Sequence, residues 1–237
     1  TPHSNARSLP PDALDAYSRR LIEDPQNAGL RPDLIVLLGD QVYADNTSDK
    51  VRRFLRRRRA AGHDGPKDQV VTFEEYTKLY LESWRDPEVR WLFATVPTVM
   101  IFDDHEMIDD WNTSAAWREE TTGTDWWRLR ICGGLVSYWV YQHLGNLSPH
   151  ELSENETWQA IRAAPDEDAG PMLEEMARAA DEHPHTVRWS YVRHWGRARL
   201  VMVDSRAGRV LTEDDRKILD DAEFDWVEAA VANAVAD

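Results

Sequence analysis

The sequence has a single cysteine, no long apolar run and fewer cations than acids. Cys132 is the one cysteine among 237 residues, which excludes an internal disulfide framework. No apolar run approaches the ~20 residues of a membrane-spanning helix, so we predict no membrane span. Lys and Arg number 28 against 43 Asp and Glu, giving a formal net charge of −15. This acidity argues against specific nucleic-acid binding, which relies on cations that neutralise phosphates.

The sequence also lacks the nucleophile motif of a serine hydrolase and any internal repeat. There is no Gly-x-Ser-x-Gly elbow, and Cys132 falls in an apolar segment where a thiol packs inertly. Without repeats or a long linker, residues 1–237 are predicted to form a single domain. The chain begins at Thr1 and ends at Asp237 inside an expected helix, so we expect a truncated domain of a longer protein, either cytoplasmic or exported.

Two short apolar runs stand out in a chain that is 42% hydrophobic and holds eleven tryptophans. Residues 34–38 and 97–102 are rich in Val, Ile and Leu, as strands covered by helices on both faces are. Apolar periodicity predicts helices over residues 11–22, 50–61, 72–84, 86–93 and 126–143, and from 222 to the end. We expect a loop at residues 1–10, a capping box from Thr72 to Glu75 and, on the same helix, a buried stripe that includes Phe73. We also expect an ordered loop at 109–124 and a hairpin at 187–204. The chain is therefore predicted to have an α/β fold.

The charge of two further segments indicates where they lie in the fold. Residues 144–184 are polar and acidic, with amphipathic helices at 154–164 and 171–182, and we interpret them as a peripheral helical insertion. Residues 52–59 contain six arginines. The reading we favour is a solvated helix face, and the alternative is an anion-attracting patch beside a phosphate site.

Ionisable side chains follow both apolar runs. The first run leads into Gly39 and Asp40, with Tyr43 three residues later. Ligands of open α/β sheets bind beyond the carboxyl ends of the strands, so we expect these groups to share one site with those after the second run. A carboxylate such as Asp40 can bridge two cations, and a phenolate such as Tyr43 suits ferric iron. The structural alternatives are an ordinary helix cap for Asp40 and a packing aromatic for Tyr43.

The second run ends in Asp103, Asp104, His105 and Glu106. Adjacent acids repel unless a cation offsets them, and a metal ion would supply that offset. We predict Asp104 as a metal ligand and His105 as the group that protonates or orients a substrate oxygen, because its ordinary pKa is ~6.5. Glu106 is expected to hold the loop.

The order of these motifs, followed by Asp-Ser-Arg at residues 204–206, resembles the PhoD-like (alkaline phosphatase D) branch of the calcineurin-type metallophosphoesterases. Residues 218–226 also resemble that family's closing segment, and the resemblance runs from about Asp33 onward. It implies an α+β sandwich in which a metallophosphoesterase-like β-sheet core is flanked by helices. It also implies metal-dependent hydrolysis of small phosphomonoesters or phosphodiesters by metal-activated water.

The resemblance also assigns roles to residues. Asp40 matches the aspartate that bridges two metals, Tyr43 a ferric ligand, and Asp104 a ligand of the second metal. His105 matches the histidine that contacts the phosphate, and Arg206 is a candidate substrate contact. The two implied ions are Fe³⁺ with Ca²⁺, Mn²⁺ or Zn²⁺.

Two of the superfamily's ligand motifs are missing from this sequence. Residues 1–32 hold no earlier ligand strand, and no Gly-His-x-His follows, since His194 is the last histidine. His183 and His185 have His-x-His spacing but lack the glycine, and we interpret them as a loop. We therefore expect the chain alone to bind metal weakly and to turn over slowly or not at all. The alternative is a non-catalytic acidic interaction module that uses Trp111, Trp117 and the arginine run.

Overall fold

The computed structural model describes residues 12–232, which form many helices around two small sheets. Strand β1 (Ile35–Leu37) pairs in parallel with β2 (Thr98–Met100), with Val36 opposite Val99. Strands β3 (Tyr191–Trp195) and β4 (Ala198–Met202) form an antiparallel hairpin. The two apolar runs and the hairpin predicted from the sequence are therefore confirmed. The mixed α/β class is confirmed with them, although each strand is shorter than its apolar run.

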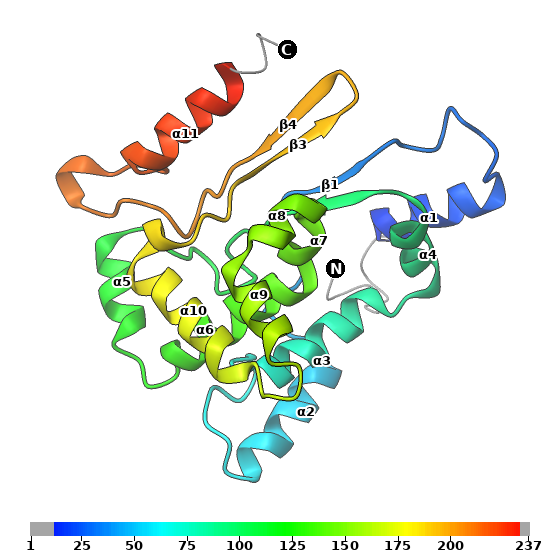
Figure 1. The fold of residues 1–237 in the computed structure, drawn as a ribbon. Coiled ribbons are helices and arrows are strands. Elements are labelled where there is room, and N and C mark those ends of the chain that lie inside the picture. Colours follow the sequence, from blue (N-terminus) through cyan, green and yellow to red (C-terminus); the bar gives the residue numbers. More distant parts are fainter. Residues whose placement is uncertain (1–11, 233–237) are drawn as a thin grey trace.

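Helices make up most of the described chain (Figure 1). Those before β2 are α1 (Ala13–Glu23), α2 (Asp49–Ala60), α3 (Phe73–Trp84) and α4 (Pro87–Thr95). Those between β2 and β3 are α5 (Ala115–Thr122), α6 (Trp127–Tyr138), α7 (Leu144–Asn146), α8 (Pro149–Glu154), α9 (Glu156–Ala163) and α10 (Gly170–Glu182). A π-helical turn (Trp139–His143) joins α6 to α7, and two 3₁₀ turns lie at Pro184–Thr186 and Glu213–Asp215. The last helix is α11 (Asp221–Ala232). Within residues 12–232, no helix combines the length and apolarity that crossing a bilayer requires.

Side-chain caps start many of the helices, as their sequences predict. The capping side chains are those of Asp12, Ser48, Asp86, Ser114, Ser148 and Asn155. The capping box expected at α3 is wrong. Thr72 makes no capping bond and donates to Glu74 instead, at 2.7 Å. Glu75 is wholly buried and is drawn away by Arg59 and by the backbone N–H of Val71 at 2.9 Å.

The largest core cluster forms around α6, which is buried nearly all round as its composition predicts. Helix α6 packs against α3 and α10, and Figure 1 shows α6 and α10 side by side. A side chain on Gly134 would overlap Met107 and Tyr76, so glycine lets α6 approach the turn that follows β2. The cluster thereby joins the helical core to that turn.

The segment 144–184 contributes to this core through α10. Its buried side chains there are Leu173, Ala177 and Ala180. Its two longer predicted helices are present as α9 and α10, whereas its status as an insertion stays a prediction.

Three further expectations are corrected. Residues 115–122 of the predicted loop are helical, because Ser114 caps the backbone N–H of Trp117 at 3.1 Å. Phe73, expected in the buried stripe of α3, is 36% exposed at the start of that helix. Strand β1 is not covered on both faces, since Val36 at its centre is 36% exposed whereas Ile35 is buried. The loop expected at residues 1–10 lies outside the described residues.

Candidate functional site

The loops after β1 and β2 meet because the two strands run parallel. Gly39 has φ +108° and Asp40 has φ +57°, so the chain turns through the left-handed region as it leaves β1. A Cβ on Gly39 would overlap the backbone and Cβ of Asp103, so only glycine fits there. This close approach places the Asp40 loop against the Asp103 loop, as the sequence predicted.

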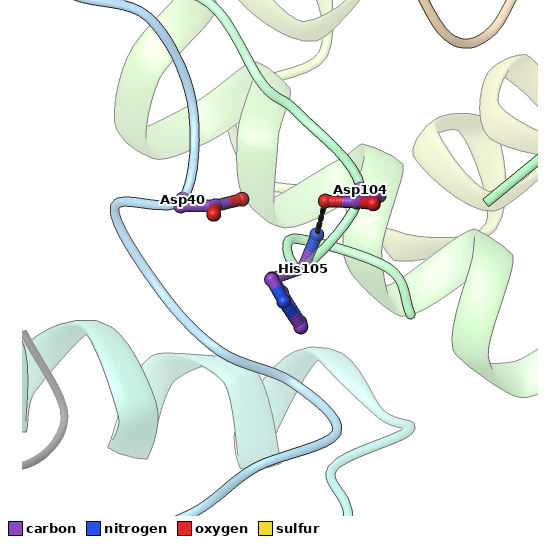
Figure 2. A group of neighbouring side chains, drawn as sticks. All are labelled: Asp40, Asp104 and His105. Carbon is purple, nitrogen blue, oxygen red and sulfur yellow. Dashed lines mark hydrogen bonds between the residues drawn. The ribbon is translucent and has the colours of Figure 1, made fainter. Parts of the chain in front are cut away.

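Asp40, Asp104 and His105 form the centre of the site (Figure 2). One ligand-type atom from each lies within 4.8 Å of the others. Oδ1 of Asp40 is buried and has no hydrogen-bond partner in the described part of the chain. Burial raises the pKa of Asp40, and the charge of Asp104 adds to this effect while His105 opposes it. A buried carboxylate oxygen without a donor, beside a second carboxylate, fits the oxygen ligands of a hard cation, and the nearby imidazole would suit a transition metal.

Asp104 is held in place by backbone donors. Its Oδ1 accepts the backbone N–H of His105 at 3.0 Å, and its Oδ2 accepts that of Asp110 at 3.0 Å. Asp104 also belongs to a second group of three carboxylates, with Asp109 and Asp110. It is therefore the residue common to both possible cation-binding groups at this edge of the sheet.

Arg206 supplies some of the positive charge that we had assigned to a metal. Its Nε donates to Asp103, and its Nη2 lies 2.9 Å from Oδ2 of Asp104. Its Nη1 donates to the carbonyl of Trp111 at 3.4 Å. The repulsion between adjacent acids is thus relieved in part by the protein itself. A phosphate would compete with two carboxylates for Arg206, whose predicted substrate contact stays a prediction.

His105 is oriented by Asp45, a residue to which the sequence analysis gave no role. Nδ1 of His105 lies 2.9 and 3.1 Å from the two carboxylate oxygens of Asp45, so this nitrogen carries the hydrogen. Asp45 Oδ2 also accepts the backbone N–H of Asp109 at 2.7 Å. Burial lowers the pKa of His105, but the hydrogen bond and charge of Asp45 outweigh it and raise the pKa above 6.5. The sequence signal for Asp45 was its place in the loop that carries Asp40.

Tyr43 lies in the same loop as Asp45 and contacts both Asp40 and His105. Its hydroxyl donates to Oδ2 of Asp40 at 3.2 Å, and its ring contacts that of His105 at a tilt of 33°, with 4.4 Å between centroids. Burial, followed by the charge of Asp40, raises the pKa of Tyr43 to about 12. Tyr43 is therefore a protonated hydroxyl in this arrangement and must lose its proton to bind ferric iron as a phenolate.

Glu106 is fully buried beneath the two loops. Burial raises its pKa to about 7, and backbone N–H groups from both loops oppose this rise. The prediction that it holds the loop agrees with these contacts.

Other candidate residues lie apart from the site. His183 and His185 have ring centroids 6.1 Å apart at the end of α10. Burial raises the pKa of Cys132 to about 11, which agrees with inert packing. In the arginine run, Arg58 and Arg59 contact the buried Glu75, so the run is partly structural and not only a solvated face.

The chain is similar to one protein family and to one solved structure. A search of the curated proteins matched nothing. A solved structure titled "Structure of PhoD" superposes with a TM-score of 0.54 and 14% sequence identity, and shows the same fold. The match covers 92% of this chain and 36% of that one, so the chain spans about a third of the length of the solved protein. The family described as PhoD-like phosphatase matches residues 15–225. The chain therefore belongs to the PhoD-like phosphatase family.

Proposed function

We propose that the protein containing this chain is a metal-dependent phosphoesterase that hydrolyses phosphate mono- or diesters with a metal-activated water. The observation that carries the proposal is the free, buried Oδ1 of Asp40 beside Asp104 and His105. The family match supports phosphoester chemistry.

Asp40, Asp104 and Tyr43 are the residues that would hold the cations. We propose two ions, Fe³⁺ with Ca²⁺, Mn²⁺ or Zn²⁺, as the resemblance implies. Asp40 has one oxygen free and one on the Tyr43 hydroxyl, so it can serve two partners at once. When bound, the cations lower the pKa of water and stabilise negative charge on the phosphoryl oxygens.

His105 is proposed as the group that donates a proton to the leaving oxygen. Its Nδ1 is committed to Asp45. Its Nε2 lies 3.7 Å from Oδ1 of the exposed Asp109, too far for a hydrogen bond, so Nε2 is the nitrogen left for substrate. Asp45 fixes the ring and favours its protonated form. A protonated Nε2 can hydrogen-bond the leaving oxygen and give it a proton as the ester bond breaks.

The two tryptophans of the interaction-module alternative give it little support. Trp111 is only 1% exposed, and Trp117, which lies in α5, is partly buried with its ring in edge contact with Trp127.

The test is hydrolysis of p-nitrophenyl phosphate and bis(p-nitrophenyl) phosphate by the full-length protein. Asp40→Asn and His105→Ala are each expected to lower kcat at least about 100-fold. The first removes a proposed metal ligand, and the second removes a positioned acid–base group, which alone contributes that much. Asp214→Asn is the control, because Asp214 is exposed in a 3₁₀ turn of acidic residues and lies outside the site. Turnover unchanged in both site variants would refute the proposal.

A further inference from the structure

The side chain of Glu106 connects two loops that are far apart in sequence. Oε2 accepts the backbone N–H of Asp40 at 2.9 Å and that of Asp103 at 3.0 Å. Oε1 accepts the backbone N–H of Gln41 at 2.9 Å. The Asp103 contact resembles the return bond of a capping-box glutamate, which reaches back three residues. The other two contacts tie the loop after β1 to the loop after β2.

Among residues 12–232, the hydrogen-bond partners of this carboxylate are all N–H donors. Besides the three backbone groups, Nε2 of Gln142 lies 3.4 Å from Oε1. An amide at position 106 would turn its own NH₂ group toward one of these two sets of donors. The surroundings therefore select a carboxylate, and no neutral side chain of the same shape satisfies them.

The π-helical turn after α6 brings Gln142 to this position. Gln142 is 2% exposed and also donates to the hydroxyl of Tyr80 at 2.8 Å. The main chain of Glu106 is fixed as well, because its carbonyl accepts the Tyr76 hydroxyl at 2.8 Å. π-turns inside helices occur frequently at functional sites, and this one reaches the residue beneath the proposed metal ligands.

The Glu106 bond falls on the strained part of the site. Asp40 has φ +57°, a conformation that residues other than glycine adopt at a cost. Its backbone N–H points to Glu106, while its Oδ1 stays free above. Glu106 therefore binds the backbone of the residue that carries the free oxygen.

We propose that Glu106 is the positioning residue of the site, setting the place of Asp40 relative to Asp104 by binding both loops through one buried carboxylate. The proposal rests on the proposed function for its purpose, but the positioning can be measured without activity. Glu106 touches neither substrate nor cation in this role, and it acts through the backbone of Asp40, Gln41 and Asp103.

The test is amide hydrogen exchange by NMR on the full chain, comparing Glu106→Gln with Glu75→Gln. Glu75 is the matched control, since it is also fully buried and accepts a backbone N–H but lies away from the Asp40 loop. In Glu106→Gln, we expect the amides that face the new NH₂ group, either Asp40 and Asp103 or Gln41, to exchange about 10- to 100-fold faster, because they lose their acceptor. In Glu75→Gln, these amides should keep wild-type rates.

Calorimetric titration with Mn²⁺ alone gives the second readout. Weaker Mn²⁺ binding in Glu106→Gln than in Glu75→Gln would support positioning, and equal affinity in the two variants would overturn it. Wild-type exchange rates at all three amides in Glu106→Gln would also overturn the proposal.

If Glu106→Gln does not fold, Glu106→Asp replaces it, because the shorter aspartate side chain does not reach the backbone N–H groups of Asp40 and Gln41. Retained protection of those two amides in Glu106→Asp would again overturn the proposal. If the wild-type protein hydrolyses neither substrate, the proposed function is refuted but the positioning role of Glu106 is not, since exchange rates do not depend on turnover.

Discussion

Replacing Gly39 with alanine should damage the site through the backbone alone. Gly39 has φ +108°, and a Cβ there would overlap Cβ, N and Cα of Asp103. The substitution adds no charge and removes no hydrogen-bonding side chain. Any loss of stability beyond the cost of holding alanine at a positive φ therefore reports the contact between the two strand-end loops.

The expected magnitude has two parts. Holding alanine at a positive φ costs about 1–3 kcal/mol. Overpacking against a backbone that cannot move freely adds about 1–3 kcal/mol. Gly62→Ala separates the two parts, because Gly62 has φ +89° and a Cβ there would meet nothing within 4 Å. The control should carry only the conformational cost.

Thermal unfolding followed by circular dichroism measures the difference. One kcal/mol shifts the Tm of a domain this size by about 2–4 °C. We therefore expect Gly39→Ala to melt about 2–12 °C below Gly62→Ala and to bind Mn²⁺ more weakly. Equal Tm values for the two variants would refute the close approach of the loops.

Three further perturbations test other parts of the structure. Tyr76→Phe should lower the free energy of unfolding by about 1–3 kcal/mol in urea titrations, since it leaves the buried carbonyl of Glu106 without its donor. Burial raises the pKa of Asp204 to about 6 from 3.8, so the folded state keeps a proton that the unfolded chain releases. That contribution to stability is complete below about pH 4 and is lost as the pH rises through 6. The resulting decline in the free energy of unfolding is on the order of 3 kcal/mol, and Asp204→Asn should flatten it. Burial of Cys132 should make its reaction with a thiol reagent at pH 8 far slower in native than in urea-unfolded protein, and equal rates would contradict its packing.

The strands and the meeting of their loops could be predicted because both signals are local. Apolar runs rich in Val, Ile and Leu identify β1 and β2, and parallel pairing then brings Asp40 and Asp104 together without further information. Helix α6 was predictable for the same reason, since its apolar pattern continues around every face.

The contacts that sequence reasoning missed join residues that are far apart in the chain. Asp45 meets His105 across 60 positions, and Arg206 meets Asp103 across 103. The ion pair of Glu75 was missed for the same reason, because Arg59 binds the carboxylate that a capping box would use. Local patterns show which side chains can ionise, whereas tertiary packing decides which partner each one finds.

The most direct test of the central claim is the metal content of the purified full-length protein, measured by elemental analysis for wild type and Asp40→Asn. Asparagine tolerates the left-handed backbone of position 40, so the variant removes charge without forcing a new conformation. The account predicts near-stoichiometric metal in the wild type, including a transition metal, and its loss in Asp40→Asn. A folded wild type without metal, or equal metal in both proteins, would contradict it.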